Sequence, residues 1–338
     1  MLYIRADMNE NIATGHVMRC MSIADAARNM GSEVLFITSD HKGDELLQAN
    51  GFKNYVLESD YLELMQGIED IEKLITEKDV LLIDTYSKTK DFMDALRGKV
   101  YTAYIDDMGE QVFNVDCIIC YPPYYPDYNY EARYDLSKTK FILGPNYAPL
   151  RKEFRNCKKK AIKDNIDNIL IVSGGSDPDR VTPKLLESIT SSYDLNARIT
   201  AICGVYSGYY DELCDKYNGK DCRVNITPST PRIKDYFDEA DVVITAAGST
   251  IYELCATGTP AIAYTYADNQ VPNANAFHKL GLIPCIGDVN GGVGIYANCI
   301  KELNRLQDKR IREEISQRMQ ETVTGNGAEN IARELLFR

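Results

Sequence analysis

The stretch Ile4-Arg5-Ala6-Asp7, followed by Ile12-Ala13-Thr14-Gly15-His16-Val17-Met18-Arg19-Cys20, decides the fold of this chain. An apolar strand at residues 2–4 leads into a polar loop that ends at Gly15. A helix is expected from His16 onward, because apolar residues recur at helical spacing; they are Val17, Met18, Met21, Ile23 and Ala24. This strand–loop–helix unit places His16 at a helix N-terminus, where backbone N–H groups and the helix dipole favour a negatively charged ligand.

His16 itself has two interpretations. An imidazole in the positive field of a helix N-terminus suits a general base. Alternatively, the histidine merely caps its helix, which is the commoner meaning of an isolated Gly-His pair. The rest of the chain favours the catalytic interpretation, as the following motifs indicate.

The composition limits the kind of partner. The chain has 338 residues, 44% of them hydrophobic, which suggests two domains with real cores. Its net charge of −12 argues against a nucleic-acid partner. Anionic groups of a substrate must therefore be bound by local features such as helix ends, glycine loops and the single arginines Arg5 and Arg19.

No targeting or metal signal is evident. The apolar N-terminal stretch is short and interrupted by Arg5 and Asp7, so neither a signal peptide nor membrane insertion is expected. The ten cysteines are scattered. Cys117 and Cys120 form a C-x-x-C pair around a buried strand, with no second pair at zinc spacing. We therefore expect reduced core cysteines and a cytoplasmic protein.

The first half of the chain alternates short apolar strands with amphipathic helices. The expected strands are residues 2–4, 33–38, 55–57, 80–84 and 100–105, and the expected helices are 44–50, 61–76 and 88–96. This pattern predicts a parallel sheet covered on both faces, with ligands beyond the carboxyl ends of the strands. Asp7, Asp84 to Tyr86 and Asp106-Asp107 fall at those ends. Each acidic residue could instead be a helix N-cap.

Two segments separate the halves. Residues 121–130, Tyr-Pro-Pro-Tyr-Tyr-Pro-Asp-Tyr-Asn-Tyr, either line a pocket or cross the surface, and we favour the surface. The basic run Lys158 to Lys160 is interpreted as a solvated linker. We expect a first domain at 1–155 and a second at 156–338, with the last helix able to pack back on the first domain.

The second half repeats the alternation, with strands expected at 168–172, 199–203, 223–226, 242–245 and 261–264. Gly174, Gly175 and Ser176 follow the first of these strands. Glycines allow backbone N–H groups to approach a phosphate closely, although a plain turn explains them equally well. Asp177 is expected to cap a helix with Pro178 at its first position.

A second turn in this half has the pattern of a nucleotide site. A strand ending at Thr245 leads to small residues and a helix start; a diphosphate would contact Gly248, Ser249 and Thr250. Glu253 lies one helical turn further, where its carboxylate can accept two hydrogen bonds from a ribose diol. A capping box explains the same residues on local grounds. After the next strand, Asn269 and Gln270 are interpreted as sugar or phosphate contacts.

Together these motifs resemble a known family. The chain is similar to the UDP-sugar hydrolase of pseudaminic acid biosynthesis and its relatives in spore-coat polysaccharide synthesis, which share the GT-B fold with the glycosyltransferase that forms lipid II. The residues that carry the resemblance are Arg5-Ala6-Asp7, Thr14 to Cys20, Ile83-Asp84, Tyr86, Ile105-Asp106-Asp107, Leu143 to Ala148, Leu150-Arg151, Glu153-Phe154, Ser173 to Pro178, Ala247 to Thr250, Glu253 and Ala267 to Gln270. They span nearly the whole chain in the family's order.

The resemblance implies a GT-B-like α/β protein, in which two doubly wound parallel-sheet domains face a cleft. The implied activity is hydrolysis of a UDP-activated acetamido sugar with inversion at the anomeric carbon, releasing UDP for nonulosonic acid or surface polysaccharide synthesis. His16 would be the base, and Tyr86 could hydrogen-bond the sugar or the water. The residues alone suggest that Asp7 and Asp84 orient the imidazole or hold sugar hydroxyls.

The expected substrate-binding set contains Gly15, Arg19, Asp107, Gly174, Gly175, Ser176, Gly248, Ser249, Thr250, Glu253, Asn269 and Gln270. No cofactor or metal is expected, because dipoles at two helix ends can offset the charge of a departing diphosphate. The acidic residues Asp7, Asp106 and Asp107 nevertheless leave a metal role open.

Two alternatives stay open: a GT-B glycosyltransferase that uses a UDP-sugar donor, and a non-catalytic nucleotide-sugar binding protein. Two departures from the family pattern also leave the sugar undetermined. Ala13 replaces a usual glycine, and Thr85 replaces a frequent histidine.

Overall fold

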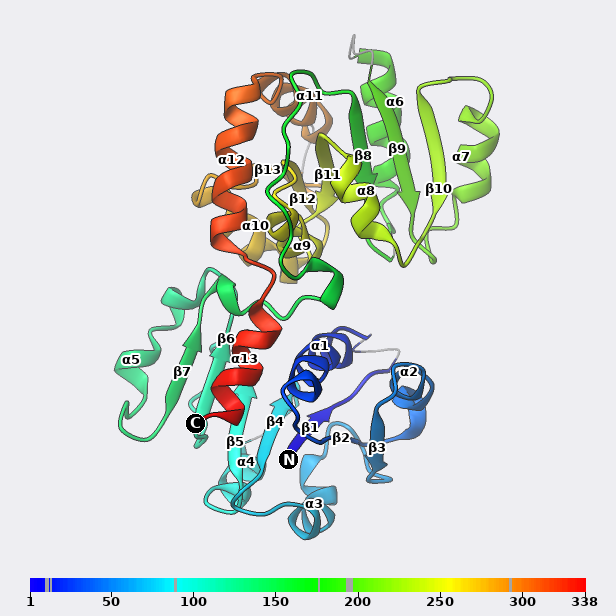
Figure 1. Cartoon of the computed structure of the whole chain (residues 1–338). Helices are drawn as coiled ribbons and strands as arrows, with labels where there is room; N and C mark the ends of the chain where they lie inside the picture. Colours follow the sequence, from blue (N-terminus) through cyan, green and yellow to red (C-terminus); the bar gives the residue numbers. More distant parts are fainter. Residues whose placement is uncertain (10–11, 13, 88–89, 176, 193–196, 292–293) are drawn as a thin grey trace. The chain divides into compact units, whose positions relative to one another are not determined.

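The computed structural model describes residues 1–9, 12, 14–87, 90–175, 177–192, 197–291 and 294–338. The chain divides into two compact units. The first unit consists of Met1–Lys152 together with Gly325–Arg338, and the second of Glu153–Thr324. The division falls close to the expected boundary at 155, and the C-terminal segment is assigned to the first unit. Each unit is built on its own parallel sheet (Figure 1).

The first unit contains a seven-stranded parallel sheet in the order β3-β2-β1-β4-β5-β6-β7. The strands are β1 (Leu2–Ala6), β2 (Val34–Thr38), β3 (Lys53–Val56), β4 (Val80–Asp84), β5 (Tyr101–Ile105), β6 (Cys117–Cys120) and β7 (Lys140–Leu143). The connecting helices are α1 (Gly15–Asn29), η1 (His41–Gly43), α2 (Asp44–Ala49), η2 (Leu64–Gly67), α3 (Ile68–Leu74), α4 (Lys90–Leu96), η3 (Tyr125–Tyr128), α5 (Tyr130–Arg133) and η4 (Pro145–Tyr147). The strand order reverses between β1 and β4, and such a switch point is where open α/β sheets bind ligands.

The second unit contains a six-stranded parallel sheet in the order β10-β9-β8-β11-β12-β13. The strands are β8 (Asn168–Val172), β9 (Arg198–Cys203), β10 (Val224–Pro228), β11 (Val242–Ala246), β12 (Ala261–Thr265) and β13 (Cys285–Asp288). Its helices are α6 (Val181–Ser192), α7 (Tyr210–Tyr217), α8 (Ile233–Glu239), α9 (Thr250–Thr257), η6 (Asp268–Gln270), α10 (Val271–Lys279), α11 (Ile295–Arg305) and α12 (Lys309–Thr322), and η5 (Lys152–Phe154) contains the division point. Here the order reverses between β8 and β11. The two sheets confirm the expected class of two doubly wound α/β domains.

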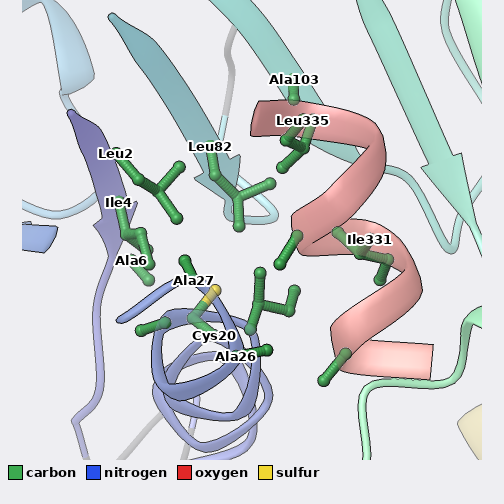
Figure 2. Packing of buried hydrophobic residues seen from close by; sticks show 14 of the residues in the cluster. Leu2, Ile4, Ala6, Cys20, Ala26, Ala27, Leu82, Ala103, Ile331 and Leu335 are labelled. Atoms are coloured by element: carbon green, nitrogen blue, oxygen red, sulfur yellow. The ribbon is translucent and has the colours of Figure 1, made fainter. Parts of the chain in front are cut away.

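The last helix, α13 (Gly327–Leu336), belongs to the core of the first unit (Figure 2). Its side chains at helical spacing are completely buried; they are Ala328, Ile331, Ala332 and Leu335. They pack in one cluster with Cys20, Ala26 and Ala27 of α1 and with Leu2 and Ile4 of β1. The C-terminal segment therefore completes the layer that covers one face of the first sheet.

One expected element differs clearly from the structure. The helix expected at 61–76 is replaced by a turn, the short helix η2 and then α3. Gly67 is the last residue of η2, directly before α3, and a Cβ at this position would lie 2.6 Å from a methyl group of Leu57. The expected helix at 88–96 is observed from Lys90, and residues 88–89 lie outside the described part. Among the helices that are described, none is long and apolar enough to cross a membrane.

Leu335 tests the packing of α13. Leu335→Ala removes a fully buried side chain, so the free energy of unfolding should fall by about 2–5 kcal/mol. The matched control is Phe337→Ala, because Phe337 follows the same helix but is 71% exposed, and its loss should change stability by less than about 0.5 kcal/mol. Urea denaturation followed by circular dichroism measures both variants. Equal losses would contradict the assignment of α13 to this core.

Candidate active site

The centre of the first unit's site is a histidine–carboxylate pair. His16 lies in the first turn of α1, and its Nδ1 is 2.6 Å from Oδ1 of Asp84, the last residue of β4. Both side chains are buried. A carboxylate only accepts hydrogen bonds, so Nδ1 carries a proton, and in the neutral imidazole Nε2 is the nitrogen with the lone pair. This tautomer is the one that a general base requires.

Arg19 fixes the other side of the Asp84 carboxylate. It lies one helical turn after His16 and donates from Nε to Oδ2 and from Nη2 to Oδ1, both at 2.6 Å. Burial by itself would raise the pKa of Asp84, but the Arg19 guanidinium more than offsets this and holds that pKa well below its usual range. Asp84 is therefore a carboxylate throughout the neutral and mildly acidic pH range.

Asp107 and Tyr86 complete this cluster. Arg19 Nη1 donates to Oδ2 of Asp107 at 2.7 Å, and the Tyr86 hydroxyl donates to the same oxygen at 3.0 Å. The Tyr86 ring meets the His16 ring edge-on, with 4.5 Å between centroids. Tyr86 is 56% exposed, so it is the solvent-facing member of a group that is otherwise largely buried.

Asp7 lies elsewhere in the hydrogen-bond network than the sequence suggested. Its Oδ2 accepts from Arg5, and its Oδ1 accepts from the backbone N–H and hydroxyl of Ser39, both at 2.7 Å. Asp7 thus joins the ends of β1 and β2, while Asp84 is the partner of His16 Nδ1. Among the acidic residues predicted at strand ends, the structure brings Asp84 and Asp107 together around α1.

The sequence reasoning missed two contributors. The Tyr121 hydroxyl accepts a hydrogen bond from Arg19 Nη1 at 2.9 Å, and the Cys20 thiol lies 3.5 Å from Asp84 Oδ2. Tyr121 directly follows β6, so the rule that placed the acidic residues at carboxyl strand ends could have found it. Cys20 lies one residue beyond Arg19 on α1 and gives no distinguishing signal in the sequence.

The second unit gathers its predicted residues at the switch point of its own sheet. Gly174 and Gly175 follow β8, and Gly248 follows the neighbouring strand β11 and precedes α9. Gly174 has φ +83°, and a Cβ at any of these three glycines would meet nothing within 4 Å. The backbone is therefore open at this edge, as close approach by a phosphate requires. Ser176 lies outside the described residues.

A buried polar network supports the glycine turn after β8. The Ser173 hydroxyl is 2.6 Å from both the Thr182 and Tyr264 hydroxyls. Asp177 accepts from the N–H groups of Val181 and Thr182 at 2.9 Å, so it caps α6. The helix begins at Val181, however, and not at Pro178 as expected, because this carboxylate reaches N–H groups further along the chain.

The remaining predicted residues lie at the same edge in different environments. Ser249 is the exposed N-cap of α9, and Thr250 and Glu253 occupy the helix's first turn, both partly buried. Asn269 is exposed in η6, beyond β12. Gln270 is buried, and its Oε1 accepts a hydrogen bond from the Tyr266 N–H at 3.1 Å. That oxygen is therefore used within the protein and not for the predicted ligand contact. Within the described ranges, no group of three or more His, Cys, Asp or Glu side chains could hold a metal ion.

Comparison with known proteins identifies a family match within the second unit and several relatives of the chain. Residues 169–322 match the family described as Glycosyltransferase family 28 C-terminal domain. An uncharacterized protein of Methanocaldococcus jannaschii is 28% identical over 77% of this chain and 54% of its own length. The spore coat polysaccharide biosynthesis protein SpsG of Bacillus subtilis is 24% identical over 44% of each chain. The chain thus spans about half the length of these curated relatives.

The similarity in fold covers nearly the whole length of both this chain and known structures. The crystal structure of Acinetobacter baumannii MurG is similar with a TM-score of 0.74 at 13% identity, covering 100% of this chain and 99% of that one. This likeness, with the two parallel sheets, shows a GT-B-like fold. The chain therefore resembles glycosyltransferases in its fold and in the sequence of its second unit.

The buried Asp84 carboxylate makes a testable contribution to stability. Asp84→Asn removes the ion pair between Asp84 and Arg19 and leaves Arg19 with Asp107 alone, and breaking a buried pair in this way costs about 3–5 kcal/mol. Because the pKa of Asp84 is depressed, its contribution is complete above the usual value of 3.8 and is lost as pH falls below it. Urea denaturation should therefore show a constant difference between wild type and variant from about pH 7 to pH 5 that narrows in stronger acid.

The matched control for this test is Asp70→Asn. Asp70 pairs with Lys73 on the surface at 2.8 Å, and such exposed pairs contribute less than about 1 kcal/mol. An Asp84→Asn loss no larger than that of the control would show that Arg19 does not depend on Asp84.

Proposed function

We propose that this chain is a nucleotide-sugar enzyme of the glycosyltransferase type, which moves a glycosyl group from a nucleoside diphosphate to an acceptor oxygen. One observation carries the proposal: Asp84 holds His16 in the tautomer that leaves Nε2 free to accept a proton. The match of the second unit to a glycosyltransferase C-terminal family and the GT-B-like fold support it.

The reaction follows from this arrangement. As the acceptor oxygen attacks the anomeric carbon, His16 Nε2 takes its proton. The bond between that carbon and the diphosphate oxygen breaks, and its electron pair leaves with the nucleotide. Attack from the opposite face inverts the anomeric centre. The Asp84 carboxylate stabilises the imidazolium that forms, as in other histidine–carboxylate pairs.

The leaving group is assigned to the second unit. Backbone N–H groups at Gly174 and Gly175 and at the start of α9 would hold the diphosphate, and fixed dipoles there would offset its growing charge without a metal. Gly248 would allow close approach only, because its own N–H donates to the Ala246 carbonyl at 2.8 Å. Glu253 would accept the ribose hydroxyls. The residues themselves indicate a nucleoside diphosphate, and the family resemblance of the sequence adds uridine and an acetamido sugar.

A second candidate is hydrolysis of the same donor, in which water replaces the acceptor. The stretch Thr14 to Cys20 favours it, because this motif carries the resemblance to a UDP-sugar hydrolase. The similarity to SpsG is compatible with either reaction in polysaccharide synthesis. A single base on the face of the sugar opposite the leaving nucleotide would serve both hydrolysis and transfer.

A panel of UDP-acetamido sugars, incubated with the protein in the presence and absence of sugar acceptors, separates the candidates. UDP release that depends on an acceptor, with a new glycoside formed, supports transfer. Equal release without any acceptor supports hydrolysis. Binding without release from any donor would contradict both and leave a nucleotide-sugar binding protein.

His16 is the first residue to test. His16→Gln keeps the polar character of the side chain but removes the base, so turnover should fall by about 10²–10⁴-fold while UDP affinity is unchanged. Affinity and turnover are separable because the proposed nucleotide residues belong to the other unit. Steady-state UDP release and calorimetry measure the two quantities. Near-normal turnover would show that His16 is not the base.

Glu253 tests the nucleotide site independently of catalysis. Glu253→Ala should weaken UDP binding by about 10- to 100-fold, because hydrogen bonds to a charged group contribute about 1.5–3 kcal/mol. Glu187→Ala, which removes an exposed carboxylate from α6, is the matched control and should bind normally. Calorimetric titration with UDP that found equal affinities for the two variants would remove Glu253 from the site.

A further inference from the structure

The tyrosine-rich segment, residues 121–130, is unused by the reaction described above but contacts the residues around His16. Tyr121 accepts from Arg19 Nη1 at 2.9 Å, and the Arg19 guanidinium carbon lies 5.8 Å from the centre of its ring. The sequence suggested a surface crossing for this segment. Its contacts instead connect it to α1.

The same segment holds the turn that carries Asp107. The Tyr130 hydroxyl donates to Asp106 Oδ2 at 2.8 Å, and the Tyr128 hydroxyl donates to the Asp107 carbonyl at 2.7 Å. Gly109, with φ +63°, packs so closely that a Cβ there would lie 2.2 Å from the Tyr128 ring. The tyrosines therefore fix both the side chain and the backbone of the turn after β5.

Arg19 has almost no donor capacity left for a substrate. Of the five N–H groups in a guanidinium, Nε and one Nη2 hydrogen go to Asp84, and the two Nη1 hydrogens serve Asp107 and Tyr121. The second Nη2 hydrogen faces the His16 side, with Nη2 3.4 Å from Nδ1. A largely buried guanidinium with four of its five N–H groups engaged suits a structural role better than the substrate contact expected from the sequence.

Asp107 also contributes through its charge. Arg19 neutralises Asp84, so this pair alone offers little net attraction to an imidazolium. Asp107 adds a second negative charge on the far side of Arg19, and the cluster then carries one excess negative charge near His16. That excess favours proton transfer to the imidazole in a site of low dielectric.

We propose that the tyrosine-rich segment is a positioning element for His16. Tyr121 and Asp107 fix Arg19, Arg19 fixes Asp84, and Asp84 fixes the tautomer and direction of the imidazole. Tyr121 and Asp107 are thus positioning residues that need not touch the substrate. The effect on rate rests on the proposed function, but the effect on the imidazole does not.

Kinetic measurements on three variants test the expected effect on rate. Asp107→Asn and Tyr121→Phe should each lower kcat by about 10- to 100-fold, as the loss of partners behind a functional histidine does in other sites, while KM for the sugar nucleotide changes less than about threefold. Tyr3→Phe is the matched control. It removes a hydroxyl that donates to the Leu74 carbonyl at 2.6 Å, outside this cluster, and should leave both constants unchanged.

A spectroscopic measurement on the same proteins needs no activity. The chain has three histidines, so ¹⁵N-histidine labelling with His16→Gln as reference assigns the His16 signals. The Nδ1–H proton bonded to Asp84 should resonate far downfield in the wild type and in Tyr3→Phe. In Asp107→Asn and Tyr121→Phe it should shift upfield or broaden. If Asp107→Asn does not fold, Tyr121→Phe carries the test alone.

The outcomes are distinct. Shifted His16 signals in a protein that turns over no sugar nucleotide would support the positioning role and overturn the proposed function. Unchanged signals and unchanged kcat in an active enzyme would overturn the positioning role alone. A raised KM with normal kcat would also overturn it, because Asp107 would then contact the substrate directly.

Discussion

The first unit is organised by the cost of burying the Asp84 carboxylate. A charge taken out of water must be paired and hydrogen-bonded, or it shifts to its neutral form. Arg19 meets this requirement with two parallel hydrogen bonds, and His16 supplies a third donor at 2.6 Å. Both residues come from the first two turns of α1, so the start of that helix must lie against the end of β4. The geometry of the base is a consequence of this pairing.

The sequence was sufficient to predict the parallel sheet but not to predict which carboxylate bonds to His16. The rule for parallel strands correctly placed Asp7, Asp84 and Asp107 at one edge. Side chains alternate along a strand, and Asp84 is in register with Ala6, which packs toward α1. Asp7 is one residue further along and turns to Ser39 instead. A difference of one position in register, which no local pattern reveals, decides which acid meets His16.

Long-range packing limited the other predictions in a similar way. The sequence allowed the last helix to pack back on the first domain, and the tertiary structure identifies its partners there, with Leu335 in the cluster around α1. The tyrosine-rich segment has turn-forming prolines, which favoured a surface interpretation. Its hydroxyl groups find buried partners because β6 ends beside β5 in the sheet. Local composition describes the backbone of such a segment and says little about its partners.

The two units divide the proposed reaction by its physical requirements. Holding a diphosphate needs backbone that a phosphate can approach closely, which the glycine turns of the second unit offer at the switch point of its sheet. Activating a weak nucleophile needs an oriented base, which the first unit offers at the corresponding point of its own sheet. A lone imidazole accepts a proton from water and from an alcohol by the same chemistry. The choice between hydrolysis and transfer therefore depends on the groups that surround Nε2, and the half-exposed Tyr86 ring, which meets the His16 ring edge-on, is a candidate for such a group.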